Sequence, residues 1–185
     1  MSQWLQVEYS VLDAIAALRC GALDVLMPLI SRLSDFGAIW ILLGLVLFCI
    51  PTQRRLGLQV WLALLLSILV CNVLLKNMVA RERPFELLEG IQLIVNTPHD
   101  FSFPSGHSSA SFAAASVLFF QRWRWALPAI VLAALTAFSR LYLYVHFPTD
   151  VLTGAVLGIL LGYLATKLFG LLEARLEARK GEDFP

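Results

Sequence analysis

The sequence predicts an all-α integral membrane protein, a bundle of five or six transmembrane helices preceded by amphipathic interfacial helices. Composition gives the first indication. Of the 185 residues, 59% are hydrophobic and only 15% are charged, whereas a soluble domain carries about 25% charged residues. The mean hydropathy is +0.77. The second indication is that apolar segments recur along the chain between short polar loops. A bilayer is therefore the expected surroundings of most of the chain.

The N-terminal segment, residues 3–18, has the period of an amphipathic helix. Trp4, Val7 and Val11 can share one apolar face, while Glu8 argues against a transmembrane span. Residues 22–34 are apolar but short. The first 34 residues are therefore expected to form two interfacial or half-inserted helices.

Five apolar segments follow and predict a transmembrane bundle over residues 36–171. A run of about 20 apolar residues crosses a hydrocarbon core of about 30 Å. The segments are residues 36–50, 56–75, 106–121, 126–145 and 151–171. In the last segment, Gly154, Gly158 and Gly162 recur every four residues, which lets a neighbouring helix approach closely. Residues 1–172 are expected to form one membrane domain, with a solvated or frayed, charged cytoplasmic tail over residues 173–185.

Basic residues predict the orientation of this bundle. They lie in two short loops and in the tail: Arg54, Arg55, Arg122, Arg124, Arg175, Arg179 and Lys180. Short cytoplasmic loops are enriched in Lys and Arg. Residues 76–105 and 140–150 should therefore lie together on the external, periplasmic side of the inner (cytoplasmic) membrane.

Other partners and sites receive little support from the sequence. The formal net charge of +1 gives no reason to expect nucleic-acid binding. Cys20, Cys49 and Cys71 are odd in number and lack metal-ligand spacing, so they are interpreted as small hydrophobic residues. The oligomeric state is left open.

Three polar clusters stand out in the apolar chain, and the first contains Lys76, Arg83 and Pro84. Lys76 and Arg83 are seven residues apart, so they point the same way if one helix continues through both. Two cations at a membrane edge can bind an anion. They can also simply extend toward lipid headgroups.

The second cluster is Pro104-Ser105-Gly106-His107, at the start of an apolar segment. Glycine lets a ligand approach the backbone, and free N–H groups at a helix start bind phosphate. Ser105 adds a hydroxyl donor. The alternative is an ordinary helix cap followed by a surface histidine.

The third cluster contains Arg140, His146 and Asp150. A carboxylate can hold one imidazole nitrogen and leave the other as a nucleophile. Arg140 offers a planar fork that suits phosphate. Thr149 can cap the helix that follows, an interpretation compatible with a catalytic Asp150.

The predicted topology brings all three clusters to one side of one membrane, without a cluster typical of a metal site. This combination predicts metal-free phosphoryl transfer without a cofactor. His146 would attack phosphorus and His107 would protonate the leaving oxygen, before water hydrolyses the phosphohistidine. The equatorial oxygens would be stabilised by Lys76, Arg83, Arg140 and the Ser105–Gly106 backbone.

The spacing of the clusters resembles the tripartite signature of the type-2 phosphatidic acid phosphatase superfamily. The matching segments are residues 76–84, 104–107 and 139–150, and every signature position carries the family's residue type. The resemblance implies a helical bundle with its site near the outer membrane surface. It implies these roles: phosphate binding by Lys76, Arg83, Ser105, Gly106 and Arg140, acid catalysis by His107, nucleophilic attack by His146, and support of His146 by Asp150.

The same resemblance suggests a lipid phosphate or diphosphate as substrate, most of all undecaprenyl diphosphate. Phosphatidic acid and phosphatidylglycerophosphate remain alternatives, as does a lipid phosphotransferase that uses the same intermediate. A vanadate-dependent oxidase fits such a small membrane chain poorly. A transporter is a rival of another class, but the sequence lacks an internal repeat and its polar residues gather at one edge.

Overall fold

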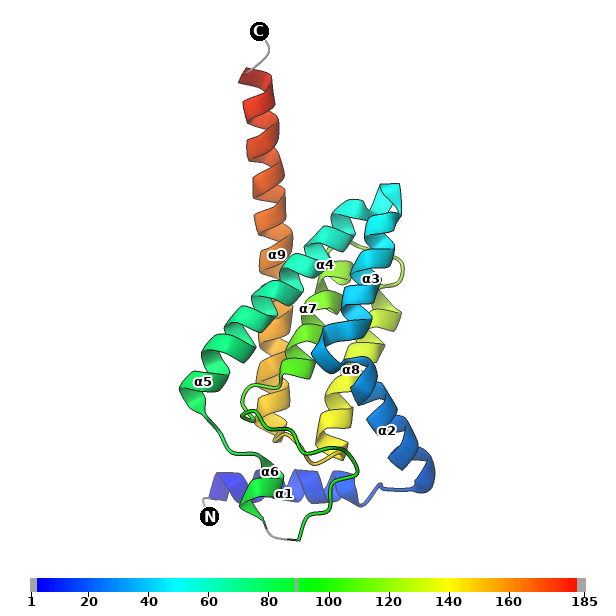
Figure 1. Cartoon of the computed structure of the whole chain (residues 1–185), viewed down its shortest axis with the longest axis vertical. Coiled ribbons are helices and arrows are strands. Elements are labelled where there is room, and N and C mark those ends of the chain that lie inside the picture. The colour runs from blue at the N-terminus through cyan, green and yellow to red at the C-terminus, as the bar shows by residue number, and fades with distance from the viewer. Residues whose placement is uncertain (1–2, 89, 183–185) are drawn as a thin grey trace.

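The computed structural model describes residues 3–88 and 90–182, and in these residues it contains helices and no strand. The helices of the bundle run roughly along its long axis (Figure 1). In order, the elements are α1 (Gln3–Ala16), α2 (Gly21–Leu33), η1 (Asp35–Gly37), α3 (Ala38–Cys49), η2 (Pro51–Gln53), α4 (Arg54–Ser67), the π-helical η3 (Ile68–Leu75), α5 (Lys76–Val79), α6 (Pro84–Leu87), α7 (Gly106–Phe120), α8 (Ala126–Tyr142) and α9 (Pro148–Glu182).

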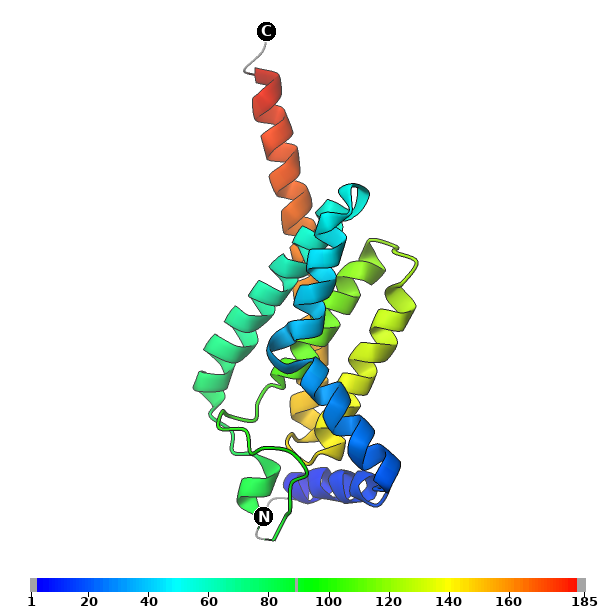
Figure 2. The same ribbon diagram turned by 45° about the vertical axis from the view of Figure 1, so that its right-hand side comes forward.

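Helix α1 lies across one end of the bundle, and α2 turns away from it by 118° (Figures 1 and 2). One face of α1 packs on the bundle through Tyr9 and Leu12, which are buried. The opposite face exposes Trp4, Val7 and Val11. The predicted amphipathic helix is thus confirmed, and its apolar outer face suits a membrane interface.

The core of the bundle is α7, which packs against α9, α8 and α4. The glycine stripe explains how closely α7 and α9 approach. A Cβ on Gly154 would lie 2.5 Å from the Ser105 carbonyl oxygen, and one on Gly158 would lie 2.4 Å from the Ser109 carbonyl oxygen. Only glycine permits this contact, so the predicted close helix approach is confirmed.

Fewer helices are long enough to cross a bilayer than the five or six that the sequence predicted. Among the described residues, Pro51–Leu87 and Pro148–Arg179 are long and apolar enough to cross a bilayer, and α1 with α2 could add a bent third. Two more apolar helices, Asp35–Cys49 and Ala126–Tyr142, are shorter. Helix α9 also continues to Glu182, so the tail from residue 173 is helical to that point and is not frayed there.

Candidate active site

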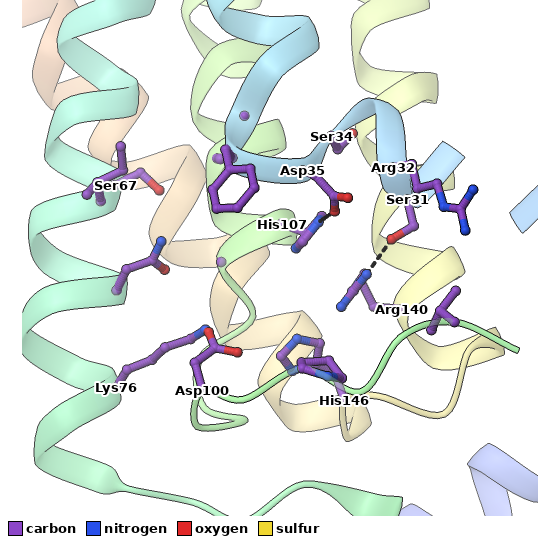
Figure 3. Close-up of a pocket in the computed structure, with 18 of the residues that line it drawn as sticks. Ser31, Arg32, Ser34, Asp35, Ser67, Lys76, Asp100, His107, Arg140 and His146 are labelled. Carbon is purple, nitrogen blue, oxygen red and sulfur yellow. Dashed lines mark hydrogen bonds and ion pairs between the residues drawn. The ribbon is translucent and has the colours of Figure 1, made fainter. Parts of the chain in front are cut away.

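A cavity of about 630 Å³ opens at the end of the bundle nearest α1 (Figure 3). The structure brings six of the eight predicted site residues to its wall: Lys76, Arg83, Gly106, His107, Arg140 and His146. The other two, Ser105 and Asp150, are fully buried and do not line the cavity. The three sequence clusters therefore meet in space.

The backbone between Lys76 and Arg83 has a conformation that the sequence did not predict. The helix carrying Lys76 ends at Val79, and Ala80 has a left-handed backbone with φ of 48°. Arg83 is extended because Pro84 follows it, which disfavours a helical conformation there. One continuous helix through both residues, the condition stated for their alignment, is thus absent, but both cations still converge.

Asp100 joins these two cations. Its carboxylate pairs with the Lys76 ammonium group, and its Oδ1 accepts a hydrogen bond from Arg83 Nη2 at 2.6 Å. Arg83 is held further by the Asp100 and Val145 carbonyl oxygens, at 2.7 and 2.6 Å. Partial burial acts to raise the pKa of Asp100, but Lys76 and then Arg83 outweigh it and hold that pKa well below its usual range. The ionised Asp100 carboxylate thus pairs with two of the cavity's cations.

His146 is buried between this cation pair and Asp150. Arg83 Nη1 lies 3.3 Å from His146 Nε2. Arginine can only donate, so the contact requires a lone pair on Nε2 and favours the proton on Nδ1. Burial, and next the charge of Arg83, lower the pKa of His146 well below its usual value. The ring is therefore neutral, with its lone pair on Nε2, and its role as a nucleophile stays a prediction.

Asp150 stands on the Nδ1 side of His146, at 3.7 Å from that nitrogen. Its Oδ2 accepts hydrogen bonds from Ser102 Oγ at 2.5 Å and from the Phe147 backbone N–H at 2.8 Å. Ser102 Oγ also lies 3.4 Å from His146 Nδ1. Sequence analysis missed Ser102, whose position just before the Pro104–His107 motif was the only available signal.

The start of α7 positions the second motif. Ser105 caps the helix, since its Oγ accepts from the Ser108 backbone N–H. Its own backbone N–H donates to the Asp150 carbonyl oxygen at 3.0 Å, which ties α7 to α9. Gly106 lines the cavity, where an added Cβ would lie 2.5 Å from Asn72 Oδ1. A role for the Ser105 hydroxyl in binding phosphate stays a prediction.

Arg140 and His107 both line the cavity (Figure 3). Arg140 is buried and donates from Nη1 to Ser31 Oγ, while its Nε has no hydrogen-bond partner among the described residues. His107 Nε2 lies 2.8 Å from Asp35 Oδ1. A buried guanidinium with unused donors is suited to binding an anion.

Arg81 was left without a role by sequence reasoning, and the structure places it behind the site. Its Nη1 donates to Asp150 Oδ1 and to Thr149 Oγ1, both at 2.7 Å, and its Nη2 pairs with Glu8. The guanidinium also lies 4.0 Å from the centroid of the Phe147 ring. Helix α1 is thereby connected to Asp150, the carboxylate beside His146.

The cavity can therefore bind a multiply charged anion and offer it both a neutral imidazole and a second histidine. Three cations face the space that such an anion would fill: Lys76, Arg83 and Arg140. Within the described part of the chain, no group of three His, Cys, Asp or Glu side chains is suited to hold a metal ion. Metal independence itself stays a prediction.

Known proteins are similar to this chain in both sequence and architecture. Residues 56–173 match the PAP2 superfamily. An undecaprenyl-diphosphatase of Sulfolobus acidocaldarius is 31% identical over 140 residues, which cover 74% of this chain and 67% of the relative. The undecaprenyl-diphosphatase BcrC of Bacillus subtilis is 28% identical over 168 residues, covering 90% and 86% of the two chains.

A solved structure extends the likeness to three dimensions. The PAP2-type phosphatidylglycerolphosphate phosphatase of Bacillus subtilis superimposes with a TM-score of 0.73 and 28% sequence identity. The match covers 90% of this chain and 87% of that one. The family match includes all eight predicted site residues and confirms the resemblance that the three motifs indicated. The chain belongs to the PAP2 superfamily.

Proposed function

We propose that this PAP2 protein is a membrane lipid phosphatase that hydrolyses undecaprenyl diphosphate to undecaprenyl phosphate. The single observation that carries this proposal is the cavity in which Lys76, Arg83 and Arg140 surround a space between His107 and His146. Family membership supports a lipid phosphatase, and two relatives named as undecaprenyl-diphosphatases support the choice of lipid.

The reaction begins when His146 Nε2 attacks the terminal phosphorus and the bond to the leaving oxygen breaks. His107 gives a proton to that oxygen. The three cations and the backbone N–H groups at the start of α7 stabilise charge on the equatorial oxygens. Water then displaces His146 from the phosphohistidine, with neutral His107 accepting the proton of that water, and inorganic phosphate leaves.

Substrate binding displaces Asp100 from its cations. The Asp100 side chain is 57% exposed, whereas those of Lys76 and Arg83 are 8% and 2% exposed. The carboxylate can therefore swing toward solvent while the cations stay in place. A phosphate group, which carries more charge and more acceptor oxygens than a carboxylate, takes over the same donors.

We place residues 1–172 in the inner membrane as one domain with five spans and the cavity on the periplasmic side. Five apolar segments and the short apolar helices α3 and α8 support this count. Arg55 pairs with Glu173 at 2.6 Å. The two basic segments that carry these residues therefore lie together, at the end of the bundle far from the cavity (Figure 1). Such clustering of positive charge is typical of the cytoplasmic side.

A phosphatidylglycerophosphate phosphatase is the second candidate, supported by the name of the solved relative from Bacillus subtilis. Phosphatidic acid is a further substrate of the same chemical class. A phosphotransferase would form the same phosphohistidine and pass the phosphoryl group to a lipid or sugar hydroxyl. The cavity geometry is compatible with each of these.

A phosphate-release assay across substrates tests the proposal. Purified protein in detergent, with EDTA present, should release phosphate from undecaprenyl diphosphate with a higher kcat/KM than from phosphatidic acid or phosphatidylglycerophosphate. A higher kcat/KM for either glycerolipid would overturn the substrate assignment. Loss of all activity in EDTA would overturn metal independence.

A further inference from the structure

We propose that Asp35 and His107 form a second His–Asp dyad, in which Asp35 positions the proton donor of the reaction. This inference rests on the proposed function, because it gives a partner to the histidine that acts as acid. Asp35 lies outside the three sequence clusters, in the short turn η1 between α2 and α3. It acts through His107, so it is a positioning residue.

The contact between the two side chains is direct. Asp35 Oδ1 lies 2.8 Å from His107 Nε2, and the residues are 72 positions apart in the sequence. Both line the cavity, with side-chain exposures of 47% for Asp35 and 22% for His107 (Figure 3). Folding therefore brings this carboxylate to the one histidine that the phosphohistidine pathway uses as an acid.

The backbone of η1 holds Asp35 at the cavity. Phe36 and Gly37 both have left-handed conformations, with φ of 54° and 71°. A left-handed Phe is unfavourable, and such residues persist where the surrounding structure fixes them. Ser34, just before the turn, is buried and shares a hydrogen bond of 3.0 Å with Thr136 of α8. The turn places Asp35 and Phe36 at the cavity wall, where Phe36 is 96% exposed.

Charge explains why His107 needs this partner. Burial of His107, and next the charges of Arg140 and Lys76, disfavour a further positive charge on its ring. An acid catalyst must nevertheless carry the proton that it gives away. Asp35 supplies the compensating negative charge next to the ring, whereas Asp100 is already paired with Lys76 and Arg83.

The contact also assigns the two ring nitrogens. Asp35 holds Nε2–H, so Nδ1–H of the imidazolium gives its proton to the leaving oxygen as the bond from that oxygen to phosphorus breaks. His107 is then neutral, and Nε2–H still donates to Asp35. His146 has the reverse arrangement, because its carboxylate is on the Nδ1 side and Nε2 attacks. Each cavity histidine thus has a carboxylate beside it, on Nε2 in His107 and on the Nδ1 side in His146.

Asp35→Asn tests the proposal, because it keeps the shape of the side chain and removes its charge. Asp24→Asn is the matched control: Asp24 lies on α2 and accepts from Tyr142 Oη at 2.6 Å, away from both histidines. On the best lipid substrate, kcat for Asp35→Asn should fall by about tenfold or more, since a positioned acid contributes about 10²–10⁴-fold. The thermal unfolding midpoints of both variants should stay near wild type, and so should kcat for Asp24→Asn.

Two further measurements separate positioning from a general loss of structure. In a His107→Ala background, Asp35→Asn should cause no additional loss of kcat. With p-nitrophenyl phosphate, whose leaving group needs no proton, Asp35→Asn should lower the rate much less than with a lipid alkyl phosphate. An equal loss on both substrates, or a full additional loss in His107→Ala, would overturn the dyad.

Failure of the proposed function would look different. In that case the wild-type protein itself would release no phosphate from any lipid phosphate or diphosphate. If the wild-type protein is active and Asp35→Asn matches Asp24→Asn on every substrate, the phosphatase stands and Asp35 has no part in acid catalysis.

Discussion

At the scale of one residue, the surroundings of His146, the proposed nucleophile, favour its neutral form. The ring is 1% exposed and lies near three cations. Burial disfavours its charged form, and Arg83, Arg140 and Lys76 disfavour it further. The cations proposed to bind phosphate thus also keep the imidazole deprotonated.

This environment predicts the protonation of His146 against pH. Because its pKa is lowered below 6.5, the ring stays neutral as pH falls through 6.5, and it charges only in more acidic solution. Titration of ¹⁵N-labelled histidines in detergent, with His146→Ala to assign the signal, measures this directly. A pKa for His146 at or above about 6.5 would contradict the described electrostatics.

Arg81 is expected to contribute to stability and to catalysis, and the two contributions can be measured separately. It bridges two buried carboxylates, Glu8 and Asp150. Arg81→Ala leaves both unpaired, so it should destabilise the protein by about 3 kcal/mol or more and lower kcat through a displaced Asp150. Arg81→Lys restores the charge without the fork and should recover part of kcat.

The exposed ion pair between Arg55 and Glu173 is the control for Arg81. Arg55→Ala should cost at most about 1 kcal/mol and leave kcat unchanged. Thermal unfolding and steady-state kinetics in the same detergent measure both properties. Equal effects of Arg81→Ala and Arg55→Ala would show that the bridge behind Asp150 has no special role.

At the scale of elements, the site depends on how α7 meets α9. The α7 start carries Gly106 and His107, and the loop just before α9 carries His146. Gly154 packs directly on the Ser105 carbonyl oxygen, and Ser105 donates to Asp150. The packing of two helices therefore sets the distance between the two histidines.

Two glycines of α9 give a matched test of this packing. A Cβ at Gly158 would lie 2.4 Å from the Ser109 carbonyl oxygen, whereas one at Gly170 has nothing within 4 Å. Gly158→Ala should destabilise by about 1–3 kcal/mol. Gly170→Ala should be neutral or stabilise by up to about 1 kcal/mol, because alanine favours helix. Thermal unfolding in detergent measures both changes in stability. Equal midpoints for the two variants would contradict tight α7–α9 packing.

At the scale of the whole molecule, the proposed orientation puts the cavity and α1 outside the cytoplasm. In a variant with Cys20, Cys49 and Cys71 replaced by alanine, His99→Cys should react with a membrane-impermeant maleimide in intact spheroplasts. Arg122→Cys should react only after permeabilisation. The reverse pattern of labelling would contradict the orientation that the basic residues predict.

Much of the architecture could be predicted from sequence because bilayer-sized apolar segments and glycine spacing are local signals. The apolar segments over residues 106–121 and 126–145 correspond to α7 and α8. The left-handed conformation of Ala80, which ends the helix four residues into the predicted loop, was not predicted, since alanine is an ordinary helix former. The extension of α9 to Glu182 was not predicted because the charged tail was interpreted as solvated or frayed.

The site divides in the same way between local and long-range signals. The three motifs identified the cavity residues because their spacing is a property of the sequence. Asp35, Asp100 and Ser102 could not be assigned, since each acts on a partner brought close only by folding. Glu8 was interpreted as a sign of an interfacial helix, and its pairing with Arg81 depends on α1 crossing the bundle end.

The most direct test of the central claim compares wild-type protein with His146→Ala. Both are purified in detergent and supplied with undecaprenyl diphosphate, and phosphate release is followed over time. Because the proposed mechanism makes His146 the covalent nucleophile, the variant should lose at least about 10³-fold in kcat. Its thermal unfolding midpoint should stay near wild type, as a control for folding. Release by His146→Ala at the wild-type rate would contradict the phosphohistidine mechanism.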